Sequence, residues 1–254
     1  MNGFIAFSKK EFTEQLRSYK SIILVAVLFL FGMMSPLLAK MLPDIMSGMK
    51  VQGMTISIPA ATALDAYGQF FKNVGQLGLV VLLLIFSGLL SQDITKGTLI
   101  VLLAKGLSRH TVIVSKFITA LVLWTVGYAL AAVTAYGYTV YLFSSVSVPN
   151  LFYALFCLWL FGAFIIALLI LASTLASGNY GGLLLAAGIL IIMLILSSFP
   201  AVQKWNPVSL ASSSAGLLTG AVTIKDTAPV VWVTLALVAA FLIMAVVIFR
   251  KKRL

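Results

Sequence analysis

Residues 151–175 read LFYALFCLWLFGAFIIALLILASTL and contain no charged side chain. A bilayer core of about 30 Å needs a helix of about 20 mostly apolar residues. The run is apolar on all sides, whereas a membrane-spanning strand alternates in polarity over about 10 residues. In lipid, a helix satisfies its backbone polar groups within its own segment. The stretch therefore predicts a membrane-spanning helix.

Five further runs resemble it, although the second and fifth of the six are short for a span. The predicted spans are Ser21–Leu38, Val74–Leu90, Phe117–Phe143, Leu151–Leu175, Gly181–Phe199 and Pro229–Phe249. We expect an all-α membrane protein with six transmembrane helices in a single domain, residues 1–254.

The composition agrees with this interpretation. Hydrophobic residues make up 62% of the chain and charged residues 9%, with a mean hydropathy of +1.14. Soluble domains have roughly 45–50% apolar and about 25% charged residues. These values exclude a soluble enzyme, a disordered chain and a disulfide-stapled secreted domain. The net charge of +11 does not indicate nucleic-acid binding, because the basic residues lie at the ends of apolar runs. Cys157 is the one cysteine, so no intrachain disulfide forms.

The distribution of basic residues predicts the orientation. With six spans, both termini lie on one side of the membrane. Twelve of the 17 basic residues then share that side: Lys9, Lys10, Arg17, Lys20, Lys96, Lys105, Arg109, Lys116, Arg250, Lys251, Lys252 and Arg253. The other five are Lys40, Lys50, Lys72, Lys204 and Lys225. The positive-inside rule places both termini in the cytoplasm of a multi-pass plasma-membrane protein.

Residues 1–20 predict an amphipathic helix on the inner membrane surface. Ile5, Phe12, Leu16 and Tyr19 fall near helical spacing on one face, and Arg17 belongs to the charged remainder. The alternative is a basic flank that only sets the topology.

Two long segments lie between spans on the predicted outer side. In residues 39–73 we expect Pro43 and Pro59 to interrupt helical structure. We expect the helix to resume from Thr62 and to extend the second span. Residues 200–228 are rich in small residues and moderately apolar. They predict either short re-entrant helices or an ordinary exposed loop.

Residues with catalytic or ion-coupling potential are scarce. All six acidic residues lie outside the apolar runs, and no predicted span contains an ionisable residue in its interior. Coupled carriers usually need such a residue, which disfavours a secondary transporter. The one histidine, His110, is in a loop, and no phosphate-binding Gly-x-x-x-x-Gly-Lys-Ser/Thr loop occurs. We expect no enzyme activity, metal or cofactor in this chain.

Gly127, Ala131 and Ala135 are small residues at four-residue spacing in the third predicted span. Small residues at this spacing let helices approach closely. Packing within one subunit is favoured over a subunit interface.

Residues 91–116, SQDITKGTLIVLLAKGLSRHTVIVSK, form the main predicted cytoplasmic loop. The acidic residue, Gly-Thr-Leu, paired leucines, Ser-Arg and the closing lysine follow the pattern of a known family. They are Asp93, Gly97-Thr98-Leu99, Leu102-Leu103, Ser108-Arg109 and Lys116. This pattern resembles the permease subunits of ABC-2 type ATP-driven exporters. Lys105-Gly106 replaces the usual proline of that family, and Ser115 replaces the glycine before the lysine. The six-span layout, the amphipathic N-terminal helix and Trp205-Asn206-Pro207 also fit.

The resemblance implies partners and roles for particular residues. Such a permease pairs with a second permease, identical or homologous, above two ATPase subunits that bind ATP and Mg²⁺. The N-terminal helix (Ile5, Phe12, Leu16, Arg17, Tyr19) and the coupling loop would face the ATPases. The loop residues assigned to this contact are Asp93, Lys96, Gly97, Thr98, Leu99, Leu102, Leu103, Ser108 and Arg109. Trp205, Asn206 and Pro207 would belong to an outer gate.

The side chains of the loop predict how it contacts a partner. Leu99, Leu102 and Leu103 can seat in a partner groove, and Gly97 permits a tight entry turn. Lys96, Lys105 and Arg109 can fix the register or contact lipid headgroups. The alternative is a loop that only lies on the membrane.

The predicted function is export of an amphipathic or hydrophobic cargo, such as an antimicrobial peptide or a drug, by a permease dimer. The alternatives are an exporter of lipid-linked glycans, a secondary carrier without an ATPase, and a membrane protein that sequesters a toxin.

Overall fold

A computed structural model describes residues 2–48, 60–95, 97–104, 106–143, 147–176 and 180–252. All regular elements in these ranges are helical, as the sequence predicts. In the first half they are α1 (Asn2–Arg17), α2 (Lys20–Gly48), α3 (Ala63–Asn73), the π-helix η1 (Val74–Gly78), α4 (Leu79–Phe86), α5 (Ser91–Thr95) and α6 (Thr98–Ala104). In the second half they are α7 (Arg109–Leu142), α8 (Leu151–Leu175), α9 (Gly181–Leu196), α10 (Pro200–Gln203), α11 (Ser209–Ser212), α12 (Ser214–Thr219) and α13 (Ile224–Lys251).

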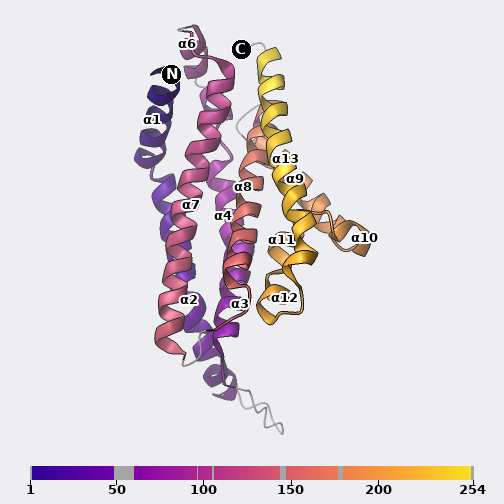
Figure 1. Cartoon of the computed structure of the whole chain (residues 1–254). Helices are drawn as coiled ribbons and strands as arrows, with labels where there is room; N and C mark the ends of the chain where they lie inside the picture. The colour runs from indigo at the N-terminus through magenta and orange to yellow at the C-terminus, as the bar shows by residue number, and fades with distance from the viewer. Residues whose placement is uncertain are drawn as a thin grey trace.

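The long helices run side by side as a bundle (Figure 1). Both chain ends lie at the same end of the bundle as α6, and α12 lies toward the opposite end. We call these the α6 end and the α12 end. Five helical stretches of the described chain are long and apolar enough to cross a membrane: Lys20–Ile45, Ala63–Thr95, Arg109–Leu142, Leu151–Leu175 and Ile224–Lys251.

The fifth of the six predicted spans is shorter than expected. Helix α9 has 16 residues, which gives a length of about 24 Å against a bilayer core of about 30 Å. The helix stops because Phe199 precedes Pro200 and takes an extended conformation, which proline imposes on the residue before it. The prediction of six full spans is therefore not confirmed; five full-length candidates and one short apolar helix are present in the described chain.

Four other spans are longer than predicted, among them α13, which begins at Ile224 rather than Pro229. Helix α2 continues through Pro36 and Pro43 to Gly48, so the expectation that Pro43 interrupts the helix was wrong. Neighbouring groups can satisfy the carbonyls that a proline frees in a membrane helix. Pro59 lies outside the described residues. Helix resumes after Thr62, as expected, because Thr62 and Asp65 form a capping box.

The third long helix, α7, begins at Arg109 rather than Phe117, because Ser108 caps it by accepting a hydrogen bond from the Thr111 amide. Residues 109–116 of the predicted loop therefore belong to this helix. Lys72 and Lys116 therefore belong to helical stretches that are long and apolar enough to cross a membrane. The expectation that no span contains an ionisable residue in its interior concerned the shorter apolar runs, and it stays a prediction.

Helix α8 lies at the centre of the bundle (Figure 1). In its most apolar window 83% of the residues are buried, against 11% in α13. Two tryptophans join α8 to α7: the Trp124 indole donates to the Trp159 carbonyl, and the Trp159 indole donates to the Thr125 hydroxyl, both at 3.0 Å.

The small-residue stripe of α7 packs against α2 of the same chain. A Cβ built on Gly32 of α2 would lie 2.5 Å from the Ala131 carbonyl oxygen, and one on Gly127 would lie 3.1 Å from Leu28. The expectation that this stripe packs within one subunit is confirmed.

Candidate functional site

Helix α1 packs against the α6 end of α7 (Figure 1). Its buried side chains are Phe7 and Glu11. The apolar face predicted from the sequence, Ile5, Phe12, Leu16 and Tyr19, is exposed, as is Arg17. An exposed apolar face next to a membrane bundle is available to lipid or to a partner, and the opposite face holds α1 on the bundle.

Glu11 belongs to a buried charge cluster that sequence reasoning missed. The Lys116 ammonium lies 2.7 Å from Glu11 Oε2 and also bonds Asp93 Oδ2. The Lys116 and Glu11 side chains are each 2% exposed. The three residues come from α1, α5 and α7. We call this group the Glu11–Asp93–Lys116 cluster.

Polar neighbours complete the cluster. Lys10 lies 3.2 Å from Glu11 and 2.6 Å from Glu14. Thr98 donates to Asp93 Oδ1 at 3.3 Å, which ties α6 to the cluster. Two cations thus face the two buried carboxylates. Burial alone lowers the pKa of Lys10, but the hydrogen bond to Glu14 and the charges of Glu11 and Asp93 outweigh it, so the pKa lies above its ordinary value.

The predicted coupling loop forms two short helices, α5 and α6, separated by a sharp turn. Gly97 has φ +69° at this turn, a conformation that side chains strain, so the expected tight turn is present. Lys96 and Lys105 lie outside the described residues. Thr98 and Asp93 are bonded as above, and Ser108 caps α7.

Helix α6 presents a different apolar face from the one expected. Leu99 is fully buried, and Leu102 and Leu103 are half-buried against the core. The exposed apolar side chains are Ile100 and Val101, at 48% and 56%. A partner that docks on α6 would therefore meet Ile100 and Val101 first.

Arg109 links the start of α7 to the end of α13. Its Nη1 atom donates to the carbonyls of Phe249, Arg250 and Lys252, at 2.6, 3.2 and 2.6 Å. Lys252 in turn donates to the carbonyl of Thr174 at 3.0 Å, at the end of α8. Cations suit helix C-termini, where carbonyls lack intrahelical partners. The two side chains therefore hold α7, α13 and α8 together at the α6 end.

Replacing Arg109 with alanine should release the last turn of α13. We expect a loss of about 2 kcal/mol in the free energy of unfolding, the usual range for hydrogen bonds of a charged group, and faster amide exchange at 248–252. Hydrogen–deuterium exchange in detergent micelles checks this. Lys251→Ala, which removes a neighbouring exposed cation, is the control. Unchanged exchange in Arg109→Ala would refute the capping role.

The predicted outer-gate residues lie at the turn between α10 and α11. Trp205 is exposed, whereas Asn206 and Pro207 are buried. The Asn206 amide donates to the Met193 carbonyl at 2.6 Å, and its oxygen accepts from the Val208 amide. Asn206 thereby turns the chain back, and α11 and α12 pack against α8.

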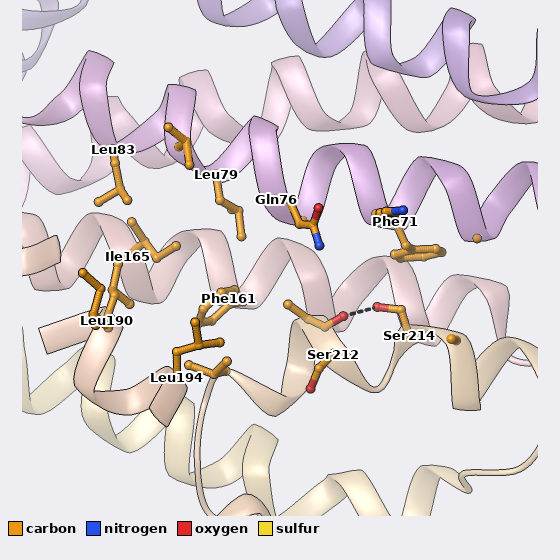
Figure 2. A pocket seen from close by; sticks show the side chains of 18 residues that line it. Phe71, Gln76, Leu79, Leu83, Phe161, Ile165, Leu190, Leu194, Ser212 and Ser214 are labelled. Carbon is orange, nitrogen blue, oxygen red and sulfur yellow. Dashed lines mark hydrogen bonds between the residues drawn. The ribbon is translucent and has the colours of Figure 1, made fainter. Parts of the chain in front are cut away.

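A groove of about 500 Å³ opens between α3, η1, α4, α8, α9 and the α11–α12 segment (Figure 2). The polarity of its lining changes from one end to the other. Leu79, Leu83, Ile165, Leu190 and Leu194 gather toward one end, and Gln76, Ser212 and Ser214 toward the other. Lys72 also lines it. The volume lies within the range of small-molecule sites, about 300–1,000 Å³.

No group of three or more His, Cys, Asp and Glu side chains in the described chain could hold a metal ion. The sequence contains one signal for the Glu11–Asp93–Lys116 cluster. Lys116 lies in an amphipathic segment directly before the strongly apolar run that starts at Phe117.

Comparisons with known proteins agree with the resemblance carried by residues 91–116. A family model described as ABC-2 family transporter protein matches residues 5–254. The chain is also similar to the uncharacterized transmembrane protein YxlG of Bacillus subtilis (strain 168), at 24% identity over 225 residues, 86% of each chain.

Proposed function

Since the chain belongs to the ABC-2 transporter family, we propose that it is the membrane subunit of an ATP-driven exporter of amphipathic or hydrophobic molecules. The observation that carries this proposal is the buried Glu11–Asp93–Lys116 cluster. It joins α1 and the α5–α6 segment to the long helix α7, and so provides a stiff connection between a docking surface and the bundle.

In this proposal the α6 end faces the cytoplasm. The basic residues support it: Lys9, Arg17, Arg109 and Arg250 all belong to elements at that end, and the positive-inside rule assigns such an end to the cytoplasm. The α12 end then faces outward, and α10–α12 with Trp205, Asn206 and Pro207 form an outer gate of short re-entrant helices.

The proposed partners are two ATPase subunits beneath α1 and α6, and a second permease, identical or homologous. ATP and Mg²⁺ bind to the ATPases, and this chain carries no cofactor. The exposed Ile100 and Val101 of α6 suit a shallow apolar groove on the ATPase. The exposed face of α1 contacts the membrane surface beside it.

The mechanism follows the contacts. When the ATPases close on ATP, they displace α6. Thr98 and Asp93 pass the displacement to Lys116 and thus to α7, and Glu11 passes it to α1. Arg109 carries the movement of α7 to α13. Because these links are short and buried, small shifts reach several helices together.

Replacing Ile100 and Val101 together with aspartate should uncouple the ATPase from the permease. Two charges would have to be desolvated at the apolar contact, so we expect at least a 10-fold loss of ATP-dependent export with unchanged membrane levels. Export from cells and immunoblotting of membranes check this. Ile224→Asp, an exposed apolar residue beyond α12, is the matched control. Full export by the double variant would contradict docking at α6.

The cargo assignment is supported by the groove beside η1. It is mainly apolar, with hydroxyl and amide groups toward one end. Such a lining suits amphipathic molecules, including antimicrobial peptides and drugs, better than simple ions.

The proposal is tested with inside-out membrane vesicles from the native host, with the chain deleted or restored. A fluorescent amphipathic peptide should accumulate only in restored vesicles given ATP, and ionophores should not abolish its uptake. Uptake driven by an ion gradient without ATP would instead identify a secondary carrier. Binding without ATP-dependent uptake would identify a sequestering protein, and ATP-dependent uptake of a lipid-linked glycan alone would redirect the cargo assignment.

A further inference from the structure

Lys72 is a charged residue within a stretch that is long and apolar enough to cross a membrane. It lies seven residues from the middle of the 33-residue membrane-spanning stretch Ala63–Thr95, or about 10 Å along a helix. We place the middle of this stretch at the membrane midplane, which puts Lys72 within the half-thickness of the hydrocarbon core, about 15 Å. Charged residues at membrane depth are costly and usually serve a function.

Lys72 also lacks an internal partner. Neither an ion pair nor a hydrogen bond of its side chain is recorded among the described residues, and no acidic side chain lines the groove there. Lys116, in the stretch Arg109–Leu142, is by contrast buried between two carboxylates. The contrast indicates that the charge of Lys72 is left for something outside this chain.

The groove extends from Lys72 along one face of its helix. Gly68, Lys72, Gly75, Gln76, Leu79 and Leu83 follow one face of the helix, from the α12 side inward. A Cβ built on Gly68 meets no atom within 4 Å, so the space beside Lys72 is open. Gln76 lies at the polar end with Ser214. Lys72 precedes Gln76 by one helical turn, and Leu83 lies eleven residues beyond Lys72, or about 16 Å along a helix.

We propose that this groove binds a single-chain amphipath with an anionic headgroup, whose anion pairs with Lys72 and whose alkyl chain lies along Leu79 and Leu83. Gln76 donates to the headgroup, and the hydroxyls of Ser212 and Ser214 complete the polar end. The inference rests on the proposed function, because it narrows the cargo class of the exporter. Lys72 is then the residue that selects the charge of the cargo.

The test measures binding to the full chain alone, without ATP or an ATPase. Ala215, which lines the groove, is replaced with cysteine in a Cys157→Ala background and labelled with an environment-sensitive dye. The protein in detergent micelles is titrated with myristoyl lysophosphatidylglycerol, which is anionic, and with myristoyl lysophosphatidylcholine, which has the same chain and no net charge. We expect about 10-fold tighter binding of the anionic lipid, as for one charge-assisted contact.

Three variants and one competitor complete the design. Lys72→Gln should bring the two lipids within 2-fold of each other while binding of the chain persists, and Lys72→Arg should keep the preference. Lys225→Gln, an exposed lysine outside the groove, should leave it unchanged. Glycerophosphoglycerol, which has the headgroup without the chain, should not displace the lipid.

Equal affinities in the unmodified chain, or a preference that survives Lys72→Gln, would overturn the inference. So would displacement by glycerophosphoglycerol, which would reveal a site for free anions. Because the assay contains no ATPase, these results are distinguishable from a failure of the exporter proposal in vesicles.

Discussion

Replacing Lys116 with methionine should lower the free energy of unfolding by about 3–5 kcal/mol, the range for removing one partner of a buried ion pair. Glu11 and Asp93 would remain buried with no cation between them. Thermal unfolding in micelles, followed by tryptophan fluorescence, measures the change. A loss of this size corresponds to a fall in Tm of about 10 °C for a chain of this length.

The control variants separate the loss of the buried ion pairs of Lys116 from general effects of removing a positive charge. Lys9→Met removes an exposed lysine of α1 and should shift Tm little. Combining Lys116→Met with Glu11→Gln and Asp93→Asn removes all three charges together and should recover most of the loss, because no unpaired buried charge remains. An unchanged Tm in Lys116→Met would show that the buried pairing contributes nothing.

Replacing Gly32 with leucine should separate α2 from α7. A Cβ at Gly32 would lie 2.5 Å from the Ala131 carbonyl oxygen and 3.0 Å from its Cα. These are backbone atoms, so the helices themselves must move apart. Overpacking of this kind costs about 1–3 kcal/mol and more where the backbone is blocked. We expect a loss of at least 3 kcal/mol in the free energy of unfolding.

Equilibrium unfolding in mixed micelles of increasing denaturing detergent measures this loss. Gly137→Leu on α7 is the matched control, because a Cβ there meets nothing within 4 Å. Similar stabilities of the two variants would mean that α2 and α7 are not in the close contact described above.

The sequence predicted the features that depend on local composition. Long apolar runs such as 151–175 predict helices, because the surface of a helix in lipid must be apolar. The four-residue spacing of Gly127 and Ala131 predicts close helix packing. The position of the loop 91–116 was also recognisable, because its residues follow one another in the chain. Helix ends were predicted less well, since Pro43 does not end α2 and the Ser108 cap begins α7 before the apolar run.

The charge cluster was beyond prediction for a different reason. Glu11 lies 105 residues from Lys116, and Asp93 lies 23 residues from it, so no local pattern joins them. The apolar run that predicts the second span begins at Val74, so the sequence alone places Lys72 in the loop before it. Once the Thr62 cap extends that helix, the same lysine lies inside the membrane stretch.

The most direct measurement is a pull-down of the tagged chain from its native host in mild detergent, with mass spectrometry of the proteins that accompany it. The account predicts a stoichiometric soluble subunit with an ATP-binding phosphate loop, lost in the Ile100→Asp, Val101→Asp variant and kept in Ile224→Asp. A second permease in the same eluate would show a heterodimer. Absence of any nucleotide-binding partner, under conditions that preserve another ABC complex from the same membranes, would contradict the account.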